Sequence, residues 1–260
     1  MSTKSKKMPK ILSGNCYDIF PEFYDLLYRR YLKSTDLFVK LVKKNTSRGG
    51  RILDLAAGTG EVSVPLLGQG FKVISFDKSS GMLKELARKS RKQGIGGYST
   101  LVGDINHIKL PHAKFDTICI RQAINYYNGF SQLRTGLVKI RRLLKTDGRF
   151  IFNAPNFKKE KDEFSVVENL YKADDGINAF VLETNKISGR MLSHKQNSIV
   201  WGGGLNEPIH IFDENKFYIF TKTDFEKALK SAGFSVVNFY STNLQPYSSK
   251  DKTIYCLAEK

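Results

Sequence analysis

The regular alternation of short apolar runs with amphipathic segments, which starts at residue 51, limits the possible folds of this chain more than any other feature. Residues 51–56 form an apolar run between two glycine turns, which is typical of a buried parallel strand. Five strands with helices between them indicate a doubly wound parallel sheet of the α/β class. The other four strands are predicted over residues 71–76, 98–102, 115–120 and 149–154. The helices are predicted over residues 61–67, from Ser79 or Ser80 to about Lys92, and from a cap at Ser131, with a turn at residues 146–148.

The pattern changes after Pro155, where a charged stretch precedes three β-rich segments near residues 177–185, 190–201 and 208–220. We interpret residues 157–220 as an antiparallel insertion after the fifth strand. The α/β pattern then resumes with a helix capped by Thr221 or Thr223 and running through Ala232. Strands over 234–240 and 253–258 follow, and they are expected to pair as a hairpin. The prediction is a seven-stranded, mostly parallel core at 46–156 and 221–260, a helical and aromatic segment at 1–45, and a β-rich insertion at 157–220.

Cysteine spacing, histidine spacing and hydropathy exclude several classes of protein. Cys16, Cys119 and Cys256 form no CxxC pair, and the four histidines fit no metal-binding pattern, so neither a disulfide framework nor a metal site is predicted. No apolar run approaches the roughly 20 residues that a membrane helix needs. Residues 1–10 are basic but lack the apolar stretch of a secretory signal, and they are interpreted as a frayed tail. A cytoplasmic protein without a membrane partner is expected.

The formal net charge of +17 is the one unusual feature of the composition. A strongly basic protein attracts polyanions, so nucleic acid is retained as a partner hypothesis. The lysines and arginines are nevertheless spread along the chain, as at residues 4–7, 84–92, 141–145 and 158–161. Spread charge is typical of a solvated surface, and it favours nucleic acid less than other partners.

A glycine-rich loop, Leu-Asp-Leu-Ala-Ala-Gly-Thr-Gly at residues 53–60, follows the first predicted strand and precedes a helix. Glycine lets the backbone approach a ligand closely, and a helix start offers free N–H groups. The third glycine of a dinucleotide fingerprint is missing, because Ser63 stands in its place. The loop therefore favours a ligand without pyrophosphate, and a tight strand-to-helix turn is the alternative.

Two acidic residues stand at the ends of the next two strands. Asp77 can accept hydrogen bonds from both hydroxyls of a ribose, and Asp104 can accept one from an adenine amino group with Ile105 against the ring. A helix cap or surface residue is the alternative for Asp77, and an ordinary loop residue is the alternative for Asp104. Together with the glycine loop, the pair indicates recognition of an adenosine.

The four segments LDLAAGTG, FDKSSGML, LVGDINHIKLP and FDTICIRQAINYY together resemble the class I S-adenosylmethionine-dependent methyltransferases. The resemblance covers roughly residues 15–155 and implies a Rossmann-like fold that binds S-adenosylmethionine. It implies that the methionine part of the cofactor contacts the loop, that Asp77 holds the ribose, and that the adenine lies near Asp104. The cofactor set implied in this way is Tyr24, Ala56, Gly58, Thr59, Gly60, Asp77, Lys78, Met82, Asp104, Ile105 and Arg121.

Candidates for acceptor contact lie after the fourth strand and in the insertion. Tyr126 and Tyr127 stand at the substrate side of such a fold, although either can instead pack under the following helix. For Tyr24, which belongs to an amino-terminal Tyr-Asp element, aromatic core packing is likewise the alternative. Weaker candidates for reaching over the mouth of the site are His194, Trp201, His210 and Tyr218, with residues 201–204 as a lid segment or a plain turn.

The expected function is in-line transfer of a methyl group to a nitrogen or oxygen of a small-molecule acceptor. A methyltransferase acting on RNA, DNA or a peptide is the first alternative. The Asn/Asp-Pro-Pro-aromatic element of base-amino methyltransferases is replaced by Arg-Gln-Ala-Ile at residues 121–124. A non-catalytic binding module is the second alternative, and an NAD-dependent dehydrogenase is disfavoured by the missing glycine. The sequence leaves the acceptor open.

Overall fold

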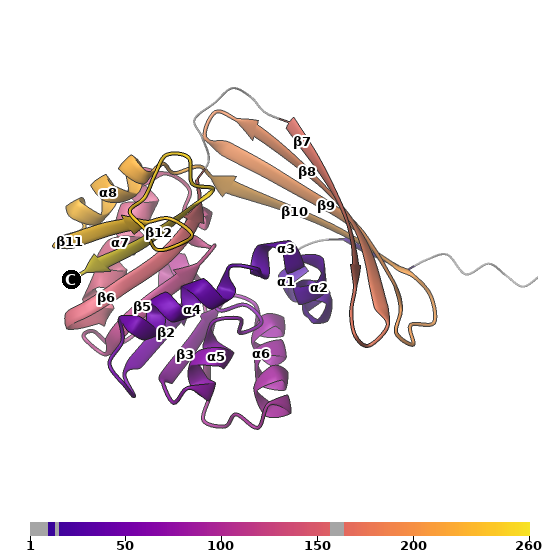
Figure 1. Ribbon diagram of the computed structural model, residues 1–260, viewed down its shortest axis with the longest axis horizontal. Helices are drawn as coiled ribbons and strands as arrows, with labels where there is room; N and C mark the ends of the chain where they lie inside the picture. The colour runs from indigo at the N-terminus through magenta and orange to yellow at the C-terminus, as the bar shows by residue number, and fades with distance from the viewer. Residues whose placement is uncertain (1–9, 14–15, 157–163) are drawn as a thin grey trace, which may run out of the picture.

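The structure is a computed structural model, and it describes residues 10–13, 16–156 and 164–260. A seven-stranded sheet covered by helices stands beside a second, five-stranded sheet, and short amino-terminal helices lie between them (Figure 1). The predicted basic tail, except Lys10, and the lysines of residues 158–161 lie outside the described residues.

The seven-stranded sheet has the order β11-β12-β6-β5-β2-β3-β4. The five central and edge strands from β2 to β6 pair in parallel, whereas β12 runs antiparallel to both of its neighbours. This arrangement confirms the predicted fold class, including the terminal hairpin. The strands are β2 (Arg51–Leu55), β3 (Lys72–Asp77), β4 (Ser99–Val102), β5 (Phe115–Arg121), β6 (Leu144–Pro155), β11 (Val236–Tyr240) and β12 (Thr253–Glu259).

Helices cover both faces of this sheet because side chains of its central strands alternate between two apolar cores. Ile118 and Ile120 of β5 belong to one core, and Cys119 between them belongs to the other. The first core packs against α7 (Phe130–Leu143) and α8 (Lys222–Ser231), and the second packs against α4 (Thr35–Lys44) and α5 (Ser63–Gly68). A fifth helix, α6 (Ser80–Lys92), packs beside α5 through Leu83 and Leu86.

The five-stranded sheet has the order β1-β10-β9-β8-β7, and β7 to β10 pair in antiparallel fashion as predicted. Burial alternates along β8, β9 and β10, so one face is covered and the other is exposed. The covered face packs against the amino-terminal helices through residues such as Phe20, Leu27 and Val181. Its strands are β1 (Lys10–Ser13), β7 (Phe164–Lys172), β8 (Ile177–Ser188), β9 (Met191–Gly202) and β10 (Ile209–Tyr218), and the covering segments are α1 (Cys16–Ile19), η1 (Pro21–Phe23), α2 (Tyr24–Leu27) and α3 (Arg29–Leu32).

Two local predictions are wrong. The cap of α7 is Gly129, with φ of +94° and no side-chain hydrogen bond, and Ser131 already lies inside the helix. Residues 146–148 belong to an irregular start of β6, where the register with β5 shifts between Leu144 and Arg149. The predicted caps of α6 and α8 are confirmed, because Ser79 accepts from the Met82 amide and Thr221 forms a capping box with Asp224.

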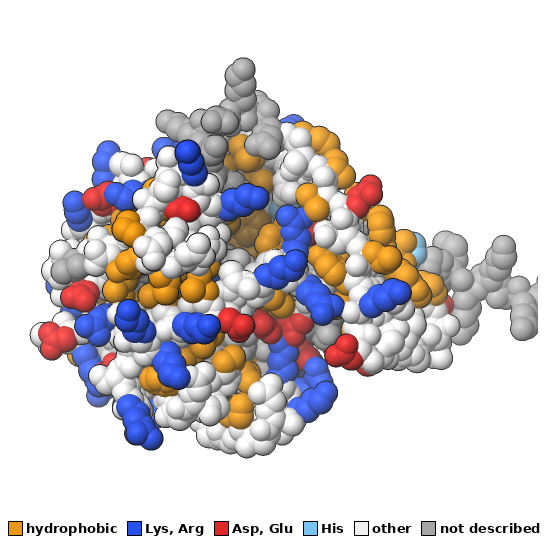
Figure 2. Space-filling model, viewed as in Figure 1, with side chains coloured by type: hydrophobic (Ala, Val, Ile, Leu, Met, Phe, Trp, Pro, Cys, Tyr) orange, Lys and Arg blue, Asp and Glu red, His pale blue; other side chains and the backbone are white. Residues whose placement is uncertain are grey.

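Two surface findings bear on partners. Among the described residues, no helix is long and apolar enough to span a membrane. Lysine and arginine side chains are scattered over the visible face of the molecule and form no single stripe (Figure 2). That distribution is the one expected of a solvated basic surface.

Candidate functional site

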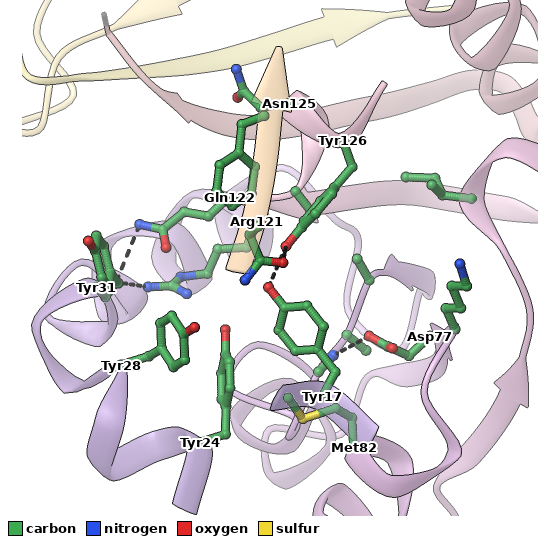
Figure 3. Close-up of a pocket in the computed structure, with 18 of the residues that line it drawn as sticks. Tyr17, Tyr24, Tyr28, Tyr31, Asp77, Met82, Arg121, Gln122, Asn125 and Tyr126 are labelled. Carbon is green, nitrogen blue, oxygen red and sulfur yellow. Dashed lines mark hydrogen bonds between the residues drawn. The ribbon is translucent and has the colours of Figure 1, made fainter. Parts of the chain in front are cut away.

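A cavity of about 700 Å³ opens at the carboxyl ends of the parallel strands. These strand ends are the usual ligand site of open α/β sheets, and cofactor pockets of roughly 300–1,000 Å³ are typical. The cavity is lined from three directions: the strand ends, the amino-terminal tyrosines and the inner face of the second sheet. Figure 3 shows the side chains of Tyr17, Tyr24 and Tyr28 directed into the space below Arg121.

The glycine loop passes below the cavity in a sharply turned backbone. Ala56, Gly58 and Gly60 have φ of +58°, +54° and +89°, a region that side chains disfavour. Ala56, Gly58 and Thr59 line the cavity. Gly60 is not among the lining residues, because it faces α6. A Cβ atom at Gly60 would lie 2.7 Å from Leu86 Cγ, so this glycine lets the loop pack closely on the helix.

Asp77 ends β3 and fastens the loop to the start of α6. Its two carboxylate oxygens accept hydrogen bonds from the backbone amides of Gly58 and Ser79, each at 2.8 Å (Figure 3 draws the first). Burial raises the pKa of Asp77, and these two amide hydrogen bonds offset part of the rise. Each oxygen retains a lone pair for a ligand hydroxyl.

Asp104 lies one strand further on, where it caps η2 (Ile105–His107). Its Oδ1 accepts the Asn106 amide at 2.8 Å, and Lys78 Nζ lies 3.7 Å from its Oδ2. Partial burial acts to raise the pKa of Asp104, but the Asn106 hydrogen bonds and the Lys78 charge outweigh burial and lower it. Met82 and Ile105 also line this end of the cavity.

Asp54, next to the last residue of β2, carries a buried carboxyl group on the cavity wall. It accepts a hydrogen bond from Ser63 Oγ at 2.7 Å, and the Cys119 thiol lies 3.6 Å away. Ser75 donates in turn to Ser63 at 2.7 Å, so a short polar chain crosses the apolar sheet. Burial raises the pKa of Asp54 to about 6, despite the hydrogen bonds from Ser63 and Cys119.

Arg121 ends β5 and lies on the cavity wall beside Gln122. Both side chains donate hydrogen bonds to the backbone oxygen of Tyr31, which joins the amino-terminal segment to the core (Figure 3). The chain turns sharply here, where Gln122 has φ of +56°. The backbone N–H of Gln122 donates to Asn153 Oδ1 at 2.9 Å. Burial lowers the pKa of Arg121, and its Nε has no hydrogen-bond partner among the described residues.

The amino-terminal tyrosines form a connected aromatic wall over the cavity. Tyr24 stacks on Tyr28 with ring centroids 4.7 Å apart, and Tyr17 lies 5.7 Å from Tyr24. The Tyr17 hydroxyl forms a short hydrogen bond with the Tyr126 hydroxyl (Figure 3). Tyr24 lines the cavity and also packs in an aromatic cluster, as the packing alternative predicts.

Tyr126 ends η3 (Ile124–Tyr126), and its environment differs from that of Tyr127, the residue that follows. Tyr126 lines the cavity, and its hydroxyl donates to Asn215 Oδ1 at 3.4 Å. Tyr127 is 1% exposed and packs under α7 against Gly136, so the structure corrects its prediction as an acceptor contact. Burial raises the pKa of Tyr127, and its hydroxyl has no partner within the described chain.

The insertion contributes one of its four predicted candidates to the cavity. His194 lines it, on the inner face of the second sheet. His210 faces the opposite side of that sheet in a separate shallow hollow, and Tyr218 packs on Phe220. Trp201 stands near the end of β9, outside the cavity lining, and residues 203–204 form the turn that follows.

Comparison with known proteins connects this site to a family. A family model described as "Methyltransferase domain" matches residues 46–233. A Bacillus subtilis protein named "Putative methyltransferase YqeM" is 27% identical over 250 residues, covering 94% of this chain and 97% of its own. The chain belongs to the class I S-adenosylmethionine-dependent methyltransferases.

Solved methyltransferases share this fold over nearly their whole length. An S-adenosylmethionine-dependent methyltransferase from Clostridium acetobutylicum superposes with a TM-score of 0.77 at 22% identity, covering 92% of this chain and 97% of its own. CalS10, an amino pentose methyltransferase from Micromonospora echinaspora with bound cofactor, gives 0.71 at 15% identity, covering 91% and 96%. At these identities, the similarity shows that the proteins share a fold.

The cavity of this methyltransferase fits S-adenosylmethionine by its chemistry. Asp77 carries carboxylate oxygens, a group that accepts hydrogen bonds from hydroxyls, and Arg121 Nε is a buried donor without a partner among the described residues, a group that binds carboxylates. The carboxyl groups of Asp54 and Asp104 further suit a cationic ligand. The sequence did not single out Asp54 or Asp25 as site residues. Their hydrogen bonds reveal them: Asp54 accepts from the buried Ser63 hydroxyl, and Asp25 accepts from Thr59 in a distant segment.

Proposed function

We propose that this methyltransferase transfers a methyl group to a nitrogen or oxygen of a small molecule by in-line displacement. The observation that carries the proposal is the enclosure of one cavity by three parts of the chain. Its lining joins the glycine loop and Asp77 to Tyr24 and to His194 of the second sheet. Residues 1–45 would then cover the cofactor, and residues 157–220 would face the acceptor.

Each lining residue takes a role that its position supports. Asp77 would hold the ribose hydroxyls, Asp104 and Ile105 the adenine, with Lys78 and Met82 beside it. Ala56, Gly58 and Thr59 would line the methionine part, with Arg121 at its carboxylate and Tyr24 above it. Gly60 would shape the loop without touching the ligand.

The protein's own contribution is to orient two reactants and to exclude water. The bound cofactor supplies a methyl group activated by a positively charged sulfur. Proximity and orientation contribute about 7–11 kcal/mol in well-oriented reactions, and the tyrosine wall, with Tyr17 and Tyr126 joined, supplies the fixed surfaces that this requires. Apolar side chains of the second sheet, such as Leu192 and Phe217, remove water from the acceptor side.

An acceptor of small-molecule size is supported by the cavity volume and by a structural neighbour. About 700 Å³ has to accommodate cofactor and acceptor together. CalS10, which shares the fold, is titled an amino pentose methyltransferase. A nucleic acid or folded protein would require the tyrosine wall to move away, and the basic side chains on the face seen in Figure 2 are scattered and form no track for a polyanion.

Calorimetric titration with S-adenosylmethionine, with NAD as the control ligand, tests the cofactor site first. Micromolar affinity for S-adenosylmethionine alone is expected. Methyl transfer to small amines, phenols, peptides and RNA is then measured between about 50 and 200 mM salt, because phosphate contacts weaken steeply over that range. Transfer to RNA that follows tight, salt-sensitive RNA binding would replace the small-molecule proposal.

A further inference from the structure

The inner face of the second sheet presents a row of polar side chains to the cavity. Ser165, Asn185, His194 and Asn215 occupy facing register positions on β7, β8, β9 and β10, and all four line the cavity. Directly paired residues on one face of a sheet have Cβ atoms about 4.5–5.5 Å apart, so the row is continuous. Buried polar side chains in such a row require hydrogen-bond partners.

His194 holds its ring in one defined tautomer. Its Nδ1 lies 2.9 Å from Asn185 Oδ1, and because an amide oxygen only accepts, Nδ1 carries the hydrogen. In the neutral ring, Nε2 therefore presents a lone pair. The side chain is 5% exposed, and Nε2 has no hydrogen-bond partner among the described residues. A buried acceptor atom without a partner, in a side chain that lines a cavity, indicates a donor on the ligand.

Buried carboxylates stand beside this ring. Glu183 and Asp213 occupy the adjacent inward positions of β8 and β10, and both are 0% exposed. Their negative charges favour a positive charge on His194 or on a nearby ligand, whereas burial acts more strongly and lowers the pKa of His194. The titratable and charged groups around the ring are Glu183, Asp213, Arg30, Tyr28 and Tyr31.

The row also connects to the methyl-transfer end of the cavity. Asn215 accepts the Tyr126 hydroxyl at 3.4 Å and donates to Asp213 at 2.6 Å. Tyr126 in turn follows β5, whose carboxyl end carries Arg121. The neighbouring inward row, Ile187, Leu192 and Phe217, is apolar and also lines the cavity. The wall thus combines a proton acceptor, flanking negative charge and a hydrocarbon surface.

We propose that this wall binds a small amine through its ammonium group and that His194 Nε2 accepts the proton that the nitrogen must lose before it attacks. This inference rests on the proposed function. The ammonium N–H bond breaks and its proton passes to Nε2, which leaves an imidazolium near the carboxylates of Glu183 and Asp213. The freed nitrogen lone pair forms the bond to the methyl carbon, while the carbon–sulfur electron pair goes to sulfur, so the positive charge passes from sulfur to the methylated nitrogen. The imidazolium then returns its proton to water.

Nitrogen-15 NMR of histidine-labelled protein tests the proton acceptor without any turnover. The chain has four histidines, and the variant His194→Gln assigns the signal of interest. In the complex with S-adenosylhomocysteine we expect Nδ1 protonated and Nε2 unprotonated at neutral pH, and a shift of Nε2 when phenethylamine is added. A protonated Nε2, or an unchanged signal at saturating phenethylamine, overturns the proposal.

Matched acceptor pairs test the substrate class. Phenethylamine is compared with 2-phenylethanol, and D-glucosamine with D-glucose, by release of S-adenosylhomocysteine. We expect the amines to react at least tenfold faster, with kcat/KM rising as pH increases through the pKa of His194. Faster methylation of the alcohols, or no turnover of either amine by protein that binds S-adenosylmethionine, overturns the amine assignment. Failure to bind S-adenosylmethionine is a different result and overturns the proposed function itself.

Substitution separates proton transfer from structure. General bases typically contribute about 10²–10⁴-fold, so His194→Gln should lower kcat by about that factor and remove the acidic limb of the pH profile. Its affinity for S-adenosylmethionine should stay within about twofold. The control is His210→Gln, on the opposite face of the same sheet, which should leave the profile unchanged. A pH limb that persists in His194→Gln assigns the proton to another group and overturns the role.

Discussion

Thr59 of the glycine loop donates its hydroxyl hydrogen bond to Asp25 Oδ1 at 2.6 Å. The contact spans 34 residues of sequence and joins the amino-terminal segment to the loop that lines the cavity. Lys89 reinforces it, because its ammonium group pairs with Asp25 and also with Glu61 at 2.8 Å. The segment that carries Tyr24 is therefore fastened at the floor of the cavity.

Replacement of Asp25 by alanine should loosen this segment and weaken cofactor retention. A hydrogen bond of this kind contributes about 0.5–1.5 kcal/mol, which corresponds to roughly twofold to thirteenfold in affinity. The change should appear mainly as faster dissociation of S-adenosylmethionine in stopped-flow measurements. Asp36→Ala, an exposed aspartate at the start of α4, is the matched control. Equal dissociation rates in the two variants would show that the segment does not retain the cofactor.

Replacement of Asp77 by asparagine should weaken S-adenosylmethionine binding about tenfold to a hundredfold. Hydrogen bonds to a charged group contribute about 1.5–3 kcal/mol, and the amide also loses one of the two acceptors that hold Gly58 and Ser79. Calorimetric titration measures the loss, with the exposed Asp147→Asn as control. An unchanged affinity would remove Asp77 from the ribose site.

Asp54 predicts a pH-dependent stability. Burial raises its folded-state pKa from 3.8 to about 6, so the folded protein binds this proton more tightly than the unfolded chain does. The stabilising effect of protonation is complete below about pH 4 and is lost as pH rises through about 6. Relative to Asp54→Asn, which keeps an acceptor for Ser63, the wild type should lose on the order of 3 kcal/mol across this range.

Denaturant unfolding at pH 4 to 8 measures this difference, with Asp147→Asn as the exposed control. As pH rises, the free energy of unfolding of the wild type should fall relative to that of Asp54→Asn. The difference between the wild type and the Asp147→Asn control should stay constant. A gap that is independent of pH would show that Asp54 keeps an ordinary pKa through contacts with water.

The sheet was predictable because its signals are local. The strands from β2 to β6 are apolar runs between turns, and the caps at Ser79 and Thr221 are read from single residues. Strand β1 was missed because its four residues pair in parallel with β10, about 200 positions away, and no local pattern encodes that pairing. Strand β7 was missed because neither of its faces is fully buried, so its hydrophobic alternation is weak.

Site residues at the ends of strands could be predicted from the sequence. Site residues that depend on packing between distant segments could not. Asp77 and Asp104 stand out because polar residues follow apolar strands, and both line the cavity. Asp54 is hidden within an apolar strand, and its importance appears only from Ser63 and Cys119 around it. The polar row of His194 requires the register of four strands, which the sequence alone does not specify.

Gly136 in α7 should tolerate no larger residue, because it leaves room for the Tyr127 ring. A Cβ atom at this position would lie 2.4 Å from Tyr127 Cζ. Gly136→Ala should therefore destabilise the fold by about 1–3 kcal/mol from overpacking, although alanine favours a helix by about 1 kcal/mol. Thermal unfolding measures the change. The double variant with Tyr127→Leu should recover much of it, and a lack of recovery would place the clash elsewhere.

Loss of the hydroxyl group of Tyr126 should change amide hydrogen exchange, whereas loss of the hydroxyl group of the adjacent Tyr127 should not. The Tyr126 hydroxyl bonds to Tyr17 and Asn215, so Tyr126→Phe should loosen the amino-terminal segment and raise amide hydrogen exchange over residues 17–32. The Tyr127 hydroxyl is buried without a partner in the described chain, so Tyr127→Phe should leave exchange unchanged and keep or slightly raise stability. Mass spectrometry of deuterium uptake compares the two variants directly. Faster exchange in Tyr127→Phe than in Tyr126→Phe would show that the Tyr126 hydroxyl does not hold the amino-terminal segment in place.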